Sequence, residues 1–187
     1  AYIDCNQQIT TDTRNIIKND LFFALKGPNF NGNSFVQKAI NNGAKYAVID
    51  EKKYYVEGKT FLVDDVLKSL QKLATIHRKK FKIPVIAITG TNGKTTTKEL
   101  IGSVLKSKFN VLITKGNLNN HIGVPLTILK TKKEHQIAIG FALETQSEKK
   151  NAYEKMKKKN LDAIILNSLN DKESGFGFDT NKICLLY

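Results

Sequence analysis

The stretch TGTNGKTTTKE, from Thr89 to Glu99, contains the most specific pattern in the sequence. It follows the apolar run PVIAI (84–88), which is typical of a buried strand, and it opens the helical pattern KTTTKELIGSVLKSKF (94–109). Glycines at 90 and 93 allow backbone N–H groups to turn toward an anion, and a helix N-terminus adds positive potential there. A strand, a glycine loop and a helix in this order predict a phosphate-binding loop.

The residues of this loop that we expect to hold a nucleotide are Gly90, Thr91, Asn92, Gly93, Lys94, Thr95 and Thr96. Lys94 is expected to reach the outer phosphates and to act as the catalytic cation, and the hydroxyl of Thr95 is a suitable Mg²⁺ ligand. The first glycine is displaced from the usual G-x-x-x-x-G-K-[ST] spacing, so the loop is a variant. A glycine turn that precedes a lysine by chance is the alternative interpretation.

Composition restricts the class of protein. Hydrophobic residues make up 41% of the chain and charged residues 25%, which is an ordinary globular balance. No apolar run approaches the roughly 20 residues that a membrane-spanning helix needs, and no signal peptide opens the chain, so we expect a cytoplasmic protein without a membrane partner. Cys5 and Cys184 lie far apart in the sequence without metal-ligand spacing, and they predict two reduced thiols, a single disulfide being the alternative.

The net charge of +13 is compatible with nucleic acid, an anionic membrane or anionic small molecules as partners. The densest lysine clusters are HRKKFK (77–82) and EKMKKKN (154–160), and neither has the interleaved aromatic residues of a nucleic-acid stacking platform. Solvated helix faces explain most of this charge, and nucleotide-type ligands are the next interpretation. We expect no specific nucleic-acid partner.

Strand and helix patterns alternate along the chain. Strands are expected over 21–25, 46–50, 85–89, 110–114, 135–143, 161–169 and 182–187, and helices over 33–43, 64–80, 94–109, around Pro125 and over 147–160. This alternation predicts an α/β fold with a doubly wound, mostly parallel sheet.

The motif TGTNGKTTT resembles the ATP loop of the Mur ligases, which build the peptide stem of bacterial peptidoglycan. The likeness continues through GNLNNHIGVPLTIL (116–129), which is more similar to the D-alanyl-D-alanine-adding MurF branch than to the branches that build the tripeptide. It also extends backwards through TTDTR (10–14) and DLFFALKGPNFNGNSFVQKAINNGAKYAVID (20–50). Roughly residues 1 to 135 carry this resemblance.

The resemblance implies an N-terminal α/β domain over residues 1–82 that holds the UDP group of a UDP-sugar-peptide substrate. The P-loop part of a central ATP-binding domain would follow over 83–136, with Lys94 and Thr95 holding the ATP phosphates and Mg²⁺. The implied substrate contacts are Thr13, Arg14, Lys26 and Gly27 at the UDP group, and Asn119, Asn120 and His121 in the cleft between the two substrates. An arginine can pair with a diphosphate and a glycine lets backbone approach it, although an ordinary turn and a plain helix-start contact are the alternatives for Arg14 and His121.

The resemblance breaks after the strand at 135–143. A Mur ligase would present a glutamate-methionine-glycine motif there, whose glutamate binds a second Mg²⁺, and Phe141 stands in place of that glutamate. Residues 137–187 instead resemble the C-terminal end of the phosphopantothenate–cysteine ligases of coenzyme A biosynthesis, which use CTP, through FALET, LNSLND and GFGFDTN. That resemblance implies nucleotide contacts for Phe141, Lys155 and Lys159, and solvated lysines are the alternative for the last two.

The sequence therefore predicts a hybrid, natural or engineered, whose two parts meet near residues 135–139. Its start without methionine, within the segment that resembles the N-terminal domain, predicts that the first strand of that domain lies outside the chain. The leading functional hypothesis is an ATP-dependent carboxylate–amine ligase of the MurF type, with ATP and Mg²⁺ as cofactors and CTP as the other candidate nucleotide. A fragment of a phosphopantothenate–cysteine ligase and an inactive nucleotide-binding module are the alternatives, and slow ATP hydrolysis is the most turnover that we expect.

Overall fold

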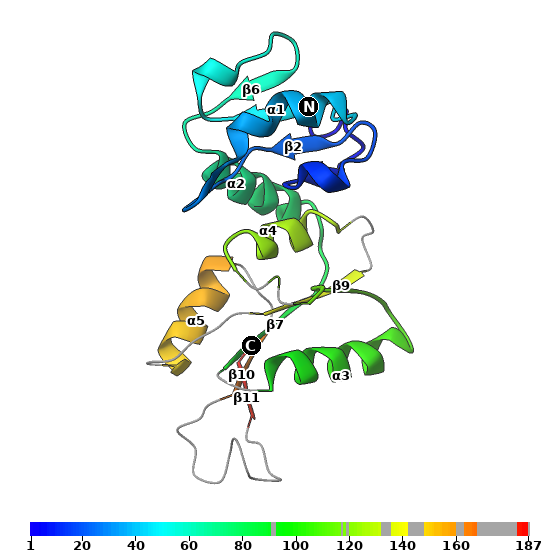
Figure 1. Cartoon of the computed structure of the whole chain (residues 1–187). Coiled ribbons are helices and arrows are strands. Elements are labelled where there is room, and N and C mark those ends of the chain that lie inside the picture. The colour runs from blue at the N-terminus through cyan, green and yellow to red at the C-terminus, as the bar shows by residue number, and fades with distance from the viewer. Residues whose placement is uncertain are drawn as a thin grey trace. The chain divides into compact units, whose positions relative to one another are not determined.

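The computed structural model describes residues 1–90, 93–116, 118, 120–131, 136–141, 148–159, 163–167 and 183–186. The chain divides into two compact units, Ala1–His77 and Arg78–Tyr187, which are described separately below (Figure 1). The division falls within helix α2 (Val66–Lys79). The predicted domain boundaries after residues 82 and 136 stay predictions. Within the described part of the chain, no helix has both the length and the apolar character required to cross a membrane.

The first unit contains a four-stranded parallel sheet in the order β1–β2–β5–β6. Its strands are β1 (Ile9–Thr10), β2 (Leu21–Phe23), β5 (Tyr46–Ile49) and β6 (Thr60–Leu62). A hairpin of β3 (Lys26–Gly27) and β4 (Phe30–Asn31), three short 3-10 helices, η1 (Thr13–Asn15), η2 (Gly32–Phe35) and η3 (Lys52–Tyr54), and α1 (Val36–Asn41) complete the unit together with α2. The strands predicted over 21–25 and 46–50 are confirmed. Strands β1 and β6 were not predicted because neither lies in an apolar run longer than three residues, whereas β2 lies in the run LFFAL.

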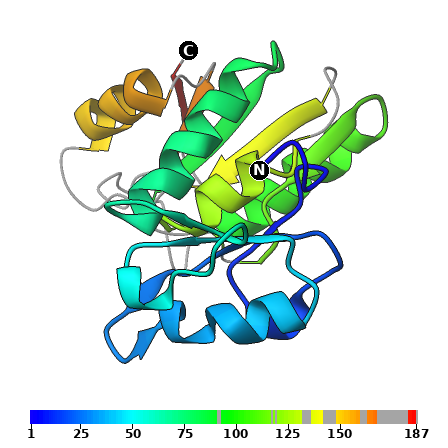
Figure 2. The ribbon, with the colours of Figure 1, turned by 90° about the horizontal axis from the view of Figure 1, so that it is seen from above.

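The core of this unit forms where α1 packs against β5, as can be followed in Figure 2. Its buried residues are Phe22, Ala24, Val36, Ala39, Ala44, Ala47 and Ile49. Several of them are alanines, whose small side chains allow the helix to lie close to the sheet. Gly43, at φ +108, turns the chain from the end of α1 into β5, as a helix-ending glycine does. Cys5 carries a free, buried thiol in accord with the expected reduced state, and the side chain of Cys184 lies outside the described part.

The second unit contains a five-stranded sheet in the order β11–β10–β7–β9–β8. Its strands are β7 (Val85–Gly90), β8 (Asn110–Ile113), β9 (Gln136–Phe141), β10 (Ala163–Asn167) and β11 (Ile183–Leu186), with β11 antiparallel to β10 and the other pairs parallel. Its helices are α3 (Lys94–Lys106), α4 (Gly123–Ile128) and α5 (Glu148–Lys159). Helices α3 and α4 both contact β9 and lie on opposite sides of it in Figure 1. The predicted mixed α/β fold with parallel sheets is confirmed.

The two parts of the chain that resemble different ligases contribute to one sheet. Strand β9, where the predicted junction falls, pairs with both β7 and β8. Strand β10, from the second part, pairs with β7 along its length, from Ala163 opposite Ile86 to Asn167 opposite Gly90. The sheet that contains β7, the strand before the predicted phosphate loop, is therefore continuous across the predicted junction.

Candidate functional site

The predicted phosphate loop lies between the carboxyl end of β7 and the start of α3. Gly93, the residue before α3, has φ +72, which glycine adopts without the steric cost that other residues meet. The Thr97 N–H donates to the carbonyl of Gly93 over 2.8 Å, and no described side chain caps this helix. Thr91 and Asn92 lie outside the described residues. The predicted order of strand, glycine and helix is present, with a helix N-terminus of the kind that binds anions.

Lys94 occupies the first position of α3 and is only 9% exposed. Burial lowers the pKa of its ammonium because a low-dielectric environment disfavours the charged form. Thr95 and Thr96, the next two predicted loop residues, are exposed. Lys94 is buried and these two threonines are exposed because consecutive residues of a helix point in different directions. Lys94 is thus directed inward, while the hydroxyl of the predicted Mg²⁺ ligand Thr95 is accessible to solvent.

A second buried lysine, Lys98, was missed by the sequence analysis. It is 1% exposed, and its Nζ donates to the carbonyl oxygens of Thr114 at 2.7 Å and Gly116 at 3.4 Å. The same Nζ lies 3.0 Å from Oε1 of Glu99. Lys98 follows Lys94 by four residues, so both lie on one face of α3. That spacing was visible in the sequence, but lysines are so rarely buried that it suggested no special role.

Asn120 lies three residues before the start of α4. Its Oδ1 accepts from the N–H groups of Ile122 at 3.1 Å and Gly123 at 2.7 Å, so the side chain stabilises the turn that enters the helix. A Cβ on Gly123 would lie 2.6 Å from the backbone of Leu118, so the preceding loop rests directly on this helix. His121 is exposed, and Asn119 lies outside the described residues. The predicted cleft contacts of all three predicted residues, Asn119, Asn120 and His121, stay predictions.

For the residues predicted to contact the nucleotide in the second half of the chain, the structure describes only the backbone. Phe141 is the last residue of β9 and pairs with Ile88 of β7, two residues before the predicted phosphate loop begins at Gly90. Lys155 and Lys159 lie four residues apart on α5, as predicted. Among the residues that the structure describes, no group of three or more His, Cys, Asp or Glu side chains could hold a metal ion. The Mg²⁺ site at Thr95 accordingly stays a prediction.

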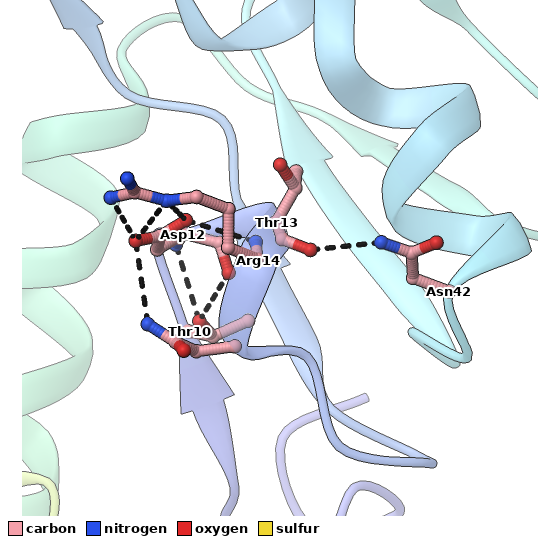
Figure 3. Close-up of polar contacts among 6 residues, drawn as sticks. Thr10, Asp12, Thr13, Arg14 and Asn42 are labelled. Atoms are coloured by element: carbon pink, nitrogen blue, oxygen red, sulfur yellow. Dashed lines mark hydrogen bonds and ion pairs between the residues drawn. The ribbon is translucent and has the colours of Figure 1, made fainter.

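In the first unit, Arg14 is paired with a carboxylate from its own turn (Figure 3). Its Nη2 donates to Oδ2 of Asp12 at 2.7 Å and its Nε donates to Oδ1 at 2.9 Å. These hydrogen bonds lower the pKa of Asp12 to about 2. The neighbouring Thr13 uses its carbonyl to accept from Nδ2 of Asn42 at 2.9 Å. A diphosphate at Arg14 would therefore compete with Asp12 for the guanidinium, which is itself exposed.

Lys26 is held by two carboxylates at the end of β5. Its Nζ lies 2.9 Å from Oδ1 of Asp50 and 3.1 Å from Oε1 of Glu51. Hydrogen bonds from Lys26, Lys53 and Asn31 lower the pKa of Glu51 to about 2. These partners of Lys26 were not predicted, although Asp50 and Glu51 are two acidic residues directly after an apolar strand. The predicted contact of Lys26 and its neighbour Gly27 with UDP stays a prediction.

One buried side chain organises this charged cluster. Asn33 is 0% exposed, and its Nδ2 donates to Oδ1 of Asp50 at 2.8 Å and to Oδ1 of Asn31 at 3.0 Å. Its own Oδ1 accepts from the backbone N–H of Asp50 at 3.1 Å. The hairpin that carries Lys26 is thereby fastened to the end of β5.

The predicted UDP contacts follow the carboxyl ends of neighbouring parallel strands. Thr13 and Arg14 come after β1, Lys26 comes after β2, and the carboxylates that hold Lys26 come after β5. In parallel α/β sheets, ligands bind outside the carboxyl ends of the strands. These residues therefore lie at the edge of the sheet where such proteins commonly bind ligands, and their contact with UDP stays a prediction.

Two family models match the chain. Residues 7–88 match the model described as "Mur ligase family, catalytic domain". Residues 106–187 match the model described as "DNA/pantothenate metabolism flavoprotein C-terminal domain".

The UDP-N-acetylmuramoyl-tripeptide–D-alanyl-D-alanine ligase of a Synechocystis species is 46% identical over 134 residues, and that of Bacillus subtilis is 41% identical over 133 residues. A continuous match that covers 70% of a 187-residue chain necessarily includes residues 90–96, the predicted phosphate loop. The N-terminal part of the chain is therefore similar in sequence to the Mur ligases, and among them to the MurF type, as the resemblance predicted.

Solved MurF structures agree with this assignment. A crystal structure of MurF from Acinetobacter baumannii has a TM-score of 0.67 at 38% identity and covers 73% of this chain and 30% of the other. The MurF ligase from Thermotoga maritima in complex with ADP has a TM-score of 0.65 at 34% identity and covers 74% of this chain and 32% of the other. The chain spans 29% of the length of the curated MurF relatives named above.

The two resemblances overlap in the sequence. The MurF relatives cover 70% of the chain, while the match to the flavoprotein C-terminal domain already begins at residue 106. The two matches therefore share residues ahead of the predicted junction. The junction at 135–139 itself stays a prediction.

Proposed function

We propose that the chain binds Mg·ATP at residues 90–96 and a UDP-linked substrate at the carboxyl edge of its first sheet. These would be two of the binding functions of an ATP-dependent carboxylate–amine ligase of the MurF type. The observation that carries the proposal is the buried Lys94 at the start of α3, directly after a glycine with positive φ. The similarity to MurF relatives over this loop supports it.

The residues of the loop fit a triphosphate. The N-terminus of α3 offers backbone N–H groups and positive potential to the phosphate oxygens. Lys94 would place its ammonium against the outer phosphates, whose charge would offset the cost of keeping this ammonium buried. The exposed hydroxyl of Thr95 would ligate Mg²⁺. When bound, Mg·ATP would supply the phosphoryl group that activates the substrate carboxylate toward an amine.

The test of the nucleotide site is calorimetric titration of Mg·ATP into wild type and Lys94→Ala. We expect the variant to bind at least about tenfold more weakly, or ~1.4 kcal/mol, because it lacks the cation at the phosphates. Lys106→Ala is the matched control, since this exposed lysine lies at the other end of the same helix. Equal affinity in wild type and Lys94→Ala would refute the assignment.

The UDP site is tested by chemical-shift perturbation on adding UDP. We expect shifts around Thr13, Arg14 and Lys26 and weaker binding by Arg14→Ala, because the guanidinium would lose its pair with the diphosphate. Lys38→Ala, an exposed lysine on α1, is the control for a general loss of positive charge. Shifts confined to residues beyond 83 would place the ligand elsewhere.

A second candidate function rests on the match of residues 106–187 to the flavoprotein C-terminal domain. It is a CTP site of the phosphopantothenate–cysteine ligase type, in which Phe141, Lys155 and Lys159 contact the nucleotide. The double variant Lys155→Ala/Lys159→Ala would then weaken CTP binding. Lys157→Ala is the control, because Lys157 has the same charge and lies on the same helix. Its ammonium is placed over the ring of Tyr153, 4.9 Å from the ring centre. A chain that binds ATP but not CTP would exclude this function.

Turnover separates a ligase from a nucleotide-binding module. For these 187 residues by themselves we expect slow ATP hydrolysis and no detectable amide product. The assay is mass spectrometry with UDP-muramoyl-tripeptide plus D-Ala-D-Ala, and separately with phosphopantothenate plus cysteine. A ligated product that disappears in Lys94→Ala would show a working enzyme, and absence of any hydrolysis would favour the binding module.

A further inference from the structure

We infer that Lys98 is a positioning residue for the nucleotide site. It connects the helix that follows the phosphate loop to the turn Thr114–Gly116 and so fixes the spacing of the two loops. The inference rests on the proposed function of the loop at 90–96. It concerns a side chain that does not itself belong to that loop.

The burial pattern of α3 is the first observation. The buried residues of this helix are Lys94, Lys98 and Gly102, spaced by four, so they form one stripe along its inner face. A Cβ on Gly102 would collide with Cδ1 of Ile113, which shows how closely the helix lies against β8. Lys98 lies between Lys94 and Gly102 on this stripe. The side chain that contacts the turn is therefore on the same stripe as the predicted phosphate-binding lysine.

The contacts of the Lys98 ammonium are the second observation. The ammonium donates to the backbone carbonyls of Thr114 and Gly116, and Oε1 of Glu99 lies 3.0 Å away. Burying a charge is costly unless it is paired and hydrogen-bonded, so these groups hold the ammonium in one place. The contacts are reciprocal, and the ammonium holds the turn to the helix.

The topology shows why this contact matters for a ligand. Strand β7 leads into the phosphate loop and β8 leads into the turn, and β9 lies between the two strands. Both connections leave the carboxyl edge of the sheet, where α/β proteins bind ligands. Lys98 joins α3, which follows the first loop, to the second loop. Asn120, whose Oδ1 accepts from the N–H of Gly123 at the start of α4, follows this turn in the sequence.

The experiment compares Mg·ATP affinity and hydrogen exchange in Lys98→Met. Methionine keeps a similar length but removes the donor to both carbonyls. We expect faster amide exchange in the peptide covering 111–121 and affinity weakened about fivefold, at the lower end of couplings between linked sites. Affinity is measured well below the melting temperature, so that a loss of stability alone would leave it unchanged.

Three further variants sharpen the result. Lys98→Arg retains a donor and should restore part of the affinity. Glu99→Gln removes only the ion pair and keeps both carbonyl contacts, so it should bind nearly as wild type. Gly116→Ala strains the turn at φ +53 without touching any neighbour within 4 Å, so it should weaken binding in the same direction even if Lys98→Met fails to fold.

The outcomes are distinguishable. Faster exchange at 111–121 together with weaker binding supports the inference. Faster exchange with unchanged affinity shows that Lys98 holds the turn but does not position the nucleotide site, and it overturns the inference. If the wild-type chain binds no Mg·ATP, the proposed function is refuted, and the inference falls with it although the exchange data still test the contact.

Discussion

The two units hold their candidate cations in opposite ways. In the first unit, Arg14 pairs with Asp12, and Lys26 pairs with Asp50 and Glu51 near the surface. In the second unit, Lys94 and Lys98 are buried in the inner face of α3.

This difference has consequences for both ligand sites. Exposed ion pairs exchange readily with water and salt, so an incoming diphosphate can replace a carboxylate at little cost. A buried ammonium has already lost its hydration, so its position is fixed by the surrounding backbone. We therefore expect the stability of the first unit to fall where acid protonates its paired carboxylates. The second should be sensitive to any change in the stripe that contains Lys94 and Lys98.

The largest change in stability should come from a substitution that disturbs backbone packing. It tests whether the stability of the first unit depends more on this packing than on its ion pairs. Gly32→Ala would place a Cβ against the backbone of Ala24 and Leu25, and we expect it to lower the free energy of unfolding by about 3 kcal/mol. Gly58→Ala is the control: no neighbour lies within 4 Å at its φ of +68, so only about 1 kcal/mol of conformational strain is expected. Urea titration followed by tyrosine fluorescence measures both, and equal losses would contradict the packing argument.

The next effect concerns the buried centre of the charged cluster. Asn33→Ala removes hydrogen bonds to Asp50 and Asn31 in a fully buried place, so we expect a loss of about 2 kcal/mol. Asn42→Ala, which removes one exposed hydrogen bond to the carbonyl of Thr13, should cost about 0.5 kcal/mol or less. Comparable losses in the two variants would show that burial does not decide the strength of this network.

A smaller effect should appear in the pH dependence of stability. The pKa of Glu51 is lowered from 4.5 to about 2, chiefly by the hydrogen bond from Lys26. A lowered carboxyl pKa means that its stabilisation is fully present above the unfolded value and is lost as the pH falls from 4.5 toward 2. Acid titration of the melting temperature should be less steep in this window for Glu51→Gln. Identical slopes for wild type and variant would refute the contribution of this pair.

The smallest effect on stability should come from Asp12→Asn. The Asp12–Arg14 pair lies on the surface, so the melting temperature should not change measurably. UDP binding should become tighter, by no more than about fivefold, because the guanidinium would no longer be shared with a carboxylate. Titration of UDP by calorimetry measures this change. Weaker binding would mean that Asp12, rather than Arg14, contacts the ligand.

The order of most strands and helices could be predicted from the sequence alone. Alternating apolar and polar runs predicted β2, β5, β7, β8, β9, β10 and β11 with their helices, and the glycine at 93 together with Lys94 predicted the start of α3. Local patterns suffice here because a strand or a helix is specified by residues close together in the chain. The antiparallel pairing of β11 and the very short β1 and β6 had no comparable local signal.

The tertiary structure decided what each cation contacts. The contact between Arg14 and Asp12 is local, but that of Lys26 with Asp50 and Glu51 joins segments far apart in the sequence. The burial of Lys98 against the carbonyls of Thr114 and Gly116 likewise exists only because α3 packs on β8. A lysine has the same composition and charge on a solvated surface and in a buried contact, and only the packing of distant segments distinguishes the two.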